Sequence, residues 1–360
     1  MPTYVIAEAG TSHGGDLQRA SELIRAAKES GADCVKFQCV IANEIVHPMT
    51  GSIDLPGGAV DIHSRFRSLE RPVAFYRRLK EYCDAAEIDF LCTAFGCESA
   101  RIVEALDPVA HKIASPETNH LELLSRISSF GRPVFLSTGV TRVGDIERAV
   151  DSLAGCAITL LHCVTAYPAP ESDYNIRLLP ALRTLLGLDV GVSDHTLEPA
   201  LVPTLAVAHG ATVIEKHFTL SRSGSGLDDP IALDPHMFTE LMSRVRRAEQ
   251  VLRDSPEEGL RIVVDELCAT YGRKRVNDVI GTGTKRLAAA ELENYRTTRR
   301  SLLATGDFPP GHTLAQSDLA ALRSERLAPG LDPSLKPVVI GAKLKKALAN
   351  GEGLRWDHLL

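Results

Sequence analysis

The sequence predicts a (β/α)8 TIM barrel followed by a small, mostly β domain. Eight short apolar segments alternate with segments of helical periodicity, such as residues 17–24 and 198–209. This order is typical of α/β proteins with a parallel sheet, and eight repeats match a closed barrel. The 360 residues are enough for a barrel of about 250 residues and a small second domain.

The eight apolar segments all end in polar or charged residues. These ends are Ala7-Glu8, Lys36-Phe37-Gln38, Cys92-Thr93, Lys112-Ile113-Ala114-Ser115, Ser137-Thr138-Gly139, Leu161-His162-Cys163, Ser193-Asp194-His195 and Glu215-Lys216-His217. In a TIM barrel the active site lies at the carboxyl ends of the strands. The lysines, hydroxyls, carboxylates and histidines are therefore expected to meet in one pocket.

Three parts follow one another along the chain. Residues 1–254 hold the alternating segments, residues 255–297 resemble a charged linker with one or two helices, and residues 298–360 contain short β-like runs and turns. Two long loops interrupt the first part. An insertion at 40–70 lies where an active-site lid is common, and a loop rich in serine and glycine spans 221–235.

Composition narrows the functional class. A net charge of -6 argues against a nucleic-acid-binding protein, and the basic stretches 273–275 and 296–300 are expected to be exposed surface. The absence of a signal pattern and of any long apolar run predicts a cytoplasmic protein without membrane contact. The eight cysteines are expected to be reduced, because several lie in or directly after strand segments: Cys34, Cys39, Cys92 and Cys163.

Several motifs occur in one order along the chain. They are Ile6-Ala7-Glu8-Ala9-Gly10 with His13-Gly14-Gly15-Asp16, Val35-Lys36-Phe37-Gln38, Lys112-Ile113-Ala114-Ser115, Leu161-His162-Cys163 with Tyr167-Pro168, Val192-Ser193-Asp194-His195-Thr196 and Ile214-Glu215-Lys216-His217-Phe218. Together they resemble the sialic acid synthase family, and the tail from Arg299 resembles the antifreeze-like (SAF) domain of that family. The resemblance implies a transferase that condenses phosphoenolpyruvate with an open-chain amino sugar or related aldose and releases phosphate.

Phosphoenolpyruvate carries a phosphate and a carboxylate, so its site needs cations and convergent hydrogen-bond donors. Lys36 and Lys112 supply the cations, and strand-end hydroxyls supply donors: Thr93, Ser115, Ser137 and Ser193. A single strand-end lysine could equally lie along the surface, but two lysines among hydroxyls favour ligand binding. The resemblance places the family's phosphoenolpyruvate contacts at the matching positions.

Two histidines end neighbouring strands. His195 and His217 are predicted to bind a divalent metal ion, and imidazole with oxygen ligands suits Mn²⁺. The resemblance implies that this metal binds the aldehyde oxygen of the acceptor and polarises its carbonyl. An isolated histidine is more often a core residue, so the prediction depends on the pair.

Other polar residues complete the predicted site. Glu8 and Glu215 end the first and eighth strands and are expected to orient the aldehyde, position water or transfer a proton. Asp194 is expected to orient a ligating histidine, and His162 to support the site or lie in the core. The other predicted substrate contacts are Gln38, Glu117, Thr165, Tyr167 and Asp228, the last matching a family aspartate that contacts sugar hydroxyls.

The chain departs from the family pattern on the acceptor side. Thr165 replaces a usual asparagine, Leu227 and Asp229 replace the proline and histidine of the family's GPDH motif, and Pro116 replaces a glycine. We therefore expect N-acetylmannosamine to be a poor acceptor. A 2,4-diacetamido sugar, or a hexose derivative without the N-acetyl group, is expected to be preferred.

The tail is predicted to complete the site. In the family it reaches across a two-fold dimer and covers the barrel of the partner, where an arginine touches the sugar. Arg323 is the predicted counterpart, with Arg326 as the alternative. The resemblance thus implies a domain-swapped homodimer.

Two alternatives to a phosphoenolpyruvate-dependent nonulosonic (sialic-acid-like) acid synthase are open at this point. Another metal-dependent barrel enzyme, an aldolase or sugar isomerase, would use the two histidines but would not need two anion-binding lysines. A non-enzymatic carbohydrate- or ice-binding protein would not need the intact set of lysines, histidines and carboxylates. Residues 298–360 also lack the regular Thr-x-Thr array expected for ice binding.

Overall fold

The computed structural model describes residues 2–55, 58–224 and 226–359, so the parts of the predicted loops at Pro56, Gly57 and Ser225 lie outside it. Within these residues, eight parallel strands close into a barrel in the order β1-β10-β9-β8-β7-β6-β5-β2. The predicted barrel is confirmed. Its strands are β1 (Tyr4–Gly10), β2 (Cys34–Cys39), β5 (Asp89–Ala94), β6 (His111–Ile113), β7 (Val134–Ser137), β8 (Ile158–Cys163), β9 (Asp189–Asp194) and β10 (Val213–His217).

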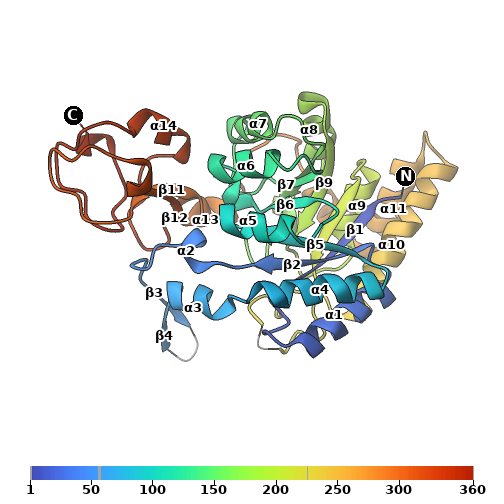
Figure 1. The fold of residues 1–360 in the computed structure, drawn as a ribbon. Helices are drawn as coiled ribbons and strands as arrows, with labels where there is room; N and C mark the ends of the chain where they lie inside the picture. Colours follow the sequence, from blue (N-terminus) through green and yellow to red (C-terminus); the bar gives the residue numbers. More distant parts are fainter. Residues whose placement is uncertain (1, 56–57, 225, 360) are drawn as a thin grey trace.

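Helices surround the barrel (Figure 1). Their apolar sides and the outward-facing strand residues form one large core that includes Leu23, Phe90 and Leu205. Because successive side chains of a strand point to opposite faces, the inward residues are left for a site inside the barrel. The helices are α1 (Leu17–Glu29), α4 (Val73–Ala85), α5 (Cys97–Glu104), α6 (Leu121–Ser128), α7 (Val143–Ser152), α8 (Leu178–Leu186), α9 (Leu201–Ala208) and α10 (Pro235–Asp254).

The insertion after β2 forms a small substructure of its own. It consists of α2 (Ala42–Ile45), the antiparallel strands β3 (Ser52–Leu55) and β4 (Gly58–Asp61), and α3 (Ile62–Leu69). Apolar residues of the insertion pack with Phe95, just beyond the end of β5. The insertion thus lies at the carboxyl end of the barrel.

The segment after α10 packs on the barrel over much of its length. It contains α11 (Gly259–Tyr271), α12 (Arg273–Ile280) and α13 (Leu292–Thr297). Val263 and Leu267 of α11, with Val276 and Val279 of α12, are buried in the barrel's outer core. These two helices therefore belong physically to the barrel.

The C-terminal domain lies beside the insertion, at the carboxyl end of the barrel strands (Figure 1). It contains the antiparallel strands β11 (Arg300–Ala304) and β12 (Leu319–Arg323) and the short helix α14 (Lys336–Val339). Its own core is built mainly from leucines, among them Leu302, Leu319 and Leu348. The small, mostly β domain predicted for the tail is confirmed.

Two sequence-based expectations concern the whole chain. All eight cysteines are free thiols, as predicted. Across the ranges that the structure describes, none of the helices combines the length and apolar character needed to span a bilayer.

Candidate active site

Two layers of side chains fill the inside of the barrel. The deeper layer is apolar and consists of Ile6, Cys34, Leu91, Ala110, Leu161 and Val213. Two positions further along the same segments, the side chains reach a cavity of about 380 Å³ at the carboxyl end: Glu8, Lys36, Thr93, Lys112, Cys163 and Glu215. Period-two alternation within a strand thus places an apolar layer directly beneath the site.

The cavity brings together fifteen of the sixteen residues predicted for the site. They are Glu8, Lys36, Gln38, Thr93, Lys112, Ser115, Ser137, Thr165, Tyr167, Ser193, His195, Glu215, His217, Asp228 and Arg323. The exception is Glu117, which is described below.

Lys36 is held by two carboxylates. Its Nζ lies 2.6 Å from Glu8 Oε2 and 3.6 Å from Glu215 Oε2, and it donates to Thr93 Oγ1 at 3.1 Å. Burial alone would lower the pKa of Lys36, but Glu215 and Glu8 outweigh burial and leave this pKa raised. Lys36 is therefore a fixed positive charge inside the cavity.

Lys112 is less well compensated. Its Nζ donates to Ser137 Oγ at 2.8 Å and lies 3.6 Å from Glu215 Oε1, and burial lowers the pKa of Lys112. Burial alone would raise the pKa of Glu215, but the ammonium groups of Lys112 and Lys36 lower it to about 2. The ionised carboxylate of Glu215 is therefore shared by the two lysines, and Lys112 has no second carboxylate such as the one that Glu8 gives to Lys36.

The two histidines of the predicted metal pair face each other. The ring centroids of His195 and His217 are 5.4 Å apart. The Nδ1 of His195 lies 2.9 Å from the carbonyl oxygen of Val164. Because a carbonyl can only accept, this Nδ1 carries the proton and Nε2 keeps a free lone pair.

His217 has an unpaired ring nitrogen. Within the described residues its buried Nδ1 has no hydrogen-bond partner, and the nearest carboxylate oxygen, Asp228 Oδ2, is 3.7 Å away. Burial lowers the pKa of both His217 and His195, which favours the neutral imidazole that metals bind. No group of three or more His, Cys, Asp or Glu side chains with metal-site geometry occurs in the described ranges. The two neutral imidazoles are therefore the candidate ligands for a divalent ion.

Glu117 lies behind the cavity wall, so its predicted place as a lining residue is wrong. It is fully buried, and its Oε1 accepts hydrogen bonds from Arg300 Nη2 at 2.7 Å and from Arg323 Nη2 at 2.8 Å. The guanidinium of Arg323 then lies over the Phe95 ring, 5.6 Å from its centroid, and lines the cavity. Glu117 therefore orients the arginine instead of touching the cavity.

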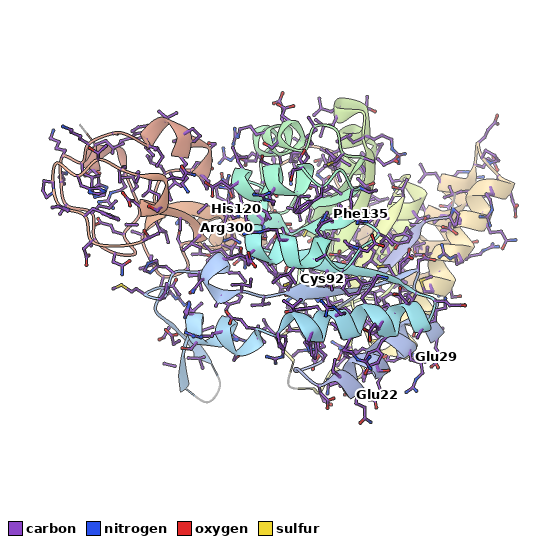
Figure 2. All side chains as sticks on the ribbon, viewed as in Figure 1. Glu22, Glu29, Cys92, His120, Phe135 and Arg300 are labelled. Atoms are coloured by element: carbon purple, nitrogen blue, oxygen red, sulfur yellow. The ribbon has the colours of Figure 1, made fainter. Side chains whose placement is uncertain are left out.

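Arg300 corrects another prediction, the exposure of the basic stretch 296–300. It is 2% exposed, because Glu117 and backbone carbonyls such as that of Phe95, at 2.8 Å, accept its hydrogen bonds. Figure 2 shows Arg300 and His120 where the C-terminal domain meets the barrel. In this structure the tail closes the barrel of its own chain, and Arg323, not Arg326, reaches the cavity.

The sequence pattern of one family matches most of the barrel, over residues 23–257. The chain belongs to the NeuB family. The SAF domain pattern matches residues 299–360 of this NeuB-family chain.

Relatives of this NeuB-family chain match it along its full length. The N,N'-diacetyllegionaminic acid synthase of Legionella pneumophila is 32% identical over 370 residues, which cover 100% of this chain and 95% of the relative. The spore coat polysaccharide biosynthesis protein SpsE of Bacillus subtilis is 32% identical over 365 residues (100% and 94%). The crystal structure of SpsE superposes with a TM-score of 0.81 over 100% of this chain and 95% of SpsE, at 31% identity. The pseudaminic acid synthase of Helicobacter pylori is 27% identical over 370 residues (100% and 98%).

Of the two predicted supporting residues of this NeuB-family chain, Asp194 has a different role, whereas His162 lies buried in the interior, one of the two places expected for it. Among the described residues no hydrogen bond joins the Asp194 carboxylate to either histidine; it accepts from Lys216 Nζ at 2.6 Å and from the backbone N–H of Thr196. His162 lies outside the cavity lining, and its Nε2 bonds to the backbone oxygen of Tyr174 at 2.6 Å. Both residues stabilise the strand ends.

Other lining residues were not predicted as site residues: Phe66, Phe95, Ala114, Pro116, Cys163, Leu227, Asn294 and Thr298. Leu227 and Pro116 could have been identified from the sequence, because both depart from the family pattern. Nothing in the sequence indicated that Asn294 and Thr298 line the cavity, since their segment resembles a polar linker.

Proposed function

We propose that this protein is a phosphoenolpyruvate-dependent nonulosonic acid synthase, a transferase that condenses phosphoenolpyruvate with an open-chain amino sugar or related aldose. The observation that carries the proposal is the pair of buried lysines, surrounded by hydroxyls and set beside two neutral histidines. Relatives named as legionaminic and pseudaminic acid synthases support it, and they do not favour an aldolase or isomerase.

Charge balance supports a divalent cation at this site. Three cationic side chains line the cavity and three carboxylates offset them: Lys36, Lys112 and Arg323 against Glu8, Glu215 and Asp228. Phosphoenolpyruvate would add its own negative charges, which a divalent ion held by His195 and His217 would offset. Mn²⁺ suits imidazole with oxygen ligands, and when bound it would supply Lewis-acid polarisation of the acceptor's carbonyl.

The chain's own residues bind both substrates and move protons. The new bond joins C3 of phosphoenolpyruvate to the aldehyde carbon, whose oxygen gains a proton; water then adds at C2, and breakage of the C2–O bond releases phosphate and a 2-keto acid. Lys36 and Lys112 bind the anionic groups, and Glu215 orients both lysines. Glu8 is our candidate for proton transfer at the aldehyde oxygen, because its carboxylate lines the same cavity as His195 and His217.

The outer part of the cavity favours an acceptor other than N-acetylmannosamine. Tyr167 and Leu227 are half exposed at the cavity, and Phe66 and Phe95 also line it. Such apolar walls suit acetamido methyls more than a chain of free hydroxyls. Of the acceptors expected from the sequence, we therefore propose a 2,4-diacetamido sugar as the preferred one, ahead of a hexose derivative without the N-acetyl group.

We propose that the protein works as a homodimer in the cytoplasm. The tail closes its own barrel in this structure, and a dimer with exchanged tails would make the same contacts between chains. The complementation experiment in the Discussion distinguishes the two arrangements.

The deciding experiment is phosphate release from phosphoenolpyruvate in the presence of Mn²⁺ and a panel of aldoses. Release that requires an aldose, strongest with a diacetamido sugar and weak with N-acetylmannosamine, is the expected result. Conversion of an aldose without phosphoenolpyruvate would instead support an aldolase or isomerase. No release with any acceptor, from protein that retains metal, would contradict the proposal.

A further inference from the structure

Glu291 is buried against the mouth of the barrel, on the segment that connects α12 to the C-terminal domain. It ends the short turn Ala289–Glu291 and is 1% exposed. Its Oε1 accepts from the backbone N–H of Val140 at 2.7 Å and of Thr165 at 2.9 Å, and its Oε2 from the N–H of Ala288 at 3.1 Å. One carboxylate therefore joins the loop after β7 to the loop after β8.

The hydrogen-bond partners of this carboxylate are backbone N–H groups, two from barrel loops and one from its own segment. Burying a carboxylate is costly unless hydrogen bonds compensate for the lost water, and an apolar side chain would fill the space without that cost. Val140 has a φ of +45°, a left-handed conformation that a β-branched residue rarely adopts. The bond from Val140 N–H to Glu291 holds the loop in this strained form.

Direct contacts lead from Glu291 to the residues of the cavity. The N–H of Gly139 donates to Ser115 Oγ at 3.0 Å, and a Cβ at Gly139 would lie 2.1 Å from Thr165 Oγ1 and 2.9 Å from Ser115 Oγ. The two loops therefore pack so closely at Gly139 that no side chain could be added there without a clash. Asn294, from the same connecting segment, donates to the carbonyl of Thr165 at 2.8 Å.

We propose that Glu291 is a positioning residue that aligns the loops after β7 and β8, and thereby couples docking of the connecting segment to substrate binding. The loop after β7 contacts the phosphoenolpyruvate side through Ser115, and the loop after β8 carries Thr165 on the acceptor side. The kinetic part of this inference rests on the proposed function, whereas the loop alignment does not.

Three variants and a control test the inference. Glu291→Met removes the acceptors at similar length, Glu291→Gln keeps an oxygen for the two loop N–H groups, and Glu291→Asp withdraws the carboxylate by one methylene. Glu293→Met is the matched control, because Glu293 is exposed on α13, two residues along. Steady-state phosphate release and hydrogen–deuterium exchange of peptides covering 138–142 and 163–168 are measured for each.

The expected result is a loss of about tenfold or more in kcat/KM for Glu291→Met, mainly through KM for phosphoenolpyruvate, with faster exchange confined to the two loop peptides. Glu291→Gln should stay within about threefold of wild type, as should Glu293→Met. A Glu291→Met protein with wild-type kinetics and wild-type loop exchange would overturn the inference. If that variant does not fold, Glu291→Asp decides: slower turnover with local exchange supports alignment, and no change in either refutes it. If the wild-type protein releases no phosphate, the proposed function fails, and loop exchange alone still tests Glu291.

Discussion

Replacing Lys112 by alanine should weaken phosphoenolpyruvate binding strongly, while the protein should remain folded. The Nζ of Lys112 lies in a site where the side chain is 3% exposed, with Ser137 Oγ at 2.8 Å and the carbonyl of Ile113 at 3.3 Å. A hydrogen bond to a charged group in such a place is worth about 2–3 kcal/mol. The dissociation constant should therefore rise by roughly 30- to 150-fold.

Isothermal titration with phosphoenolpyruvate at fixed Mn²⁺ measures this effect. Lys274→Ala is the control, since the Lys274 side chain is 91% exposed and pairs with Asp278 on the surface. Its affinity should equal that of wild type, and thermal melts should show that both variants are folded. An unchanged affinity for folded Lys112→Ala would place this lysine outside the phosphoenolpyruvate site and remove the main support for the proposed function.

Three further predictions follow from the site and the core. His195→Ala and His217→Ala should each lose bound Mn²⁺, measured by elemental analysis after dialysis, and most activity; full activity in metal-free buffer would refute the metal pair. Arg323→Ala should turn over substrate poorly, and mixing it with His217→Ala should restore part of the activity if tails are exchanged in a dimer; no recovery after verified subunit exchange would assign the arginine to its own chain. Burial, with Arg71 and Arg19 nearby, lowers the pKa of His13 to about 4, so the unfolded chain binds a proton there at higher pH than the folded protein. The free energy of unfolding should thus fall by up to about 3 kcal/mol as the pH drops from about 6.5 to 4, and urea titrations of His13→Gln should show a flatter dependence.

The barrel and the side chains at its mouth could be predicted because both depend on local patterns. Alternation within a strand decides which residues face inward, and the parallel order of the strands brings all their carboxyl ends to one side. Lys36, Lys112, His195 and His217 therefore meet in the cavity whatever the details of packing. The supporting contacts do not follow such a rule, and Asp194 shows this, because it pairs with Lys216 and not with a histidine.

The sequence alone determined the fold class, the two domains and most of the residues in the cavity, since these depend on the periodicity and order of the segments. Only the tertiary structure decided which buried charges pair across long distances in the chain. Arg300 and Arg323 converge on Glu117, and Glu291 holds two loops of the barrel. The physical reason is that the sequence does not show what compensates a charged residue in a polar stretch. Water can solvate it, or a distant carboxylate and backbone groups can accept or donate its hydrogen bonds. The packing of the tail on the barrel decides which of these charged residues are buried and paired.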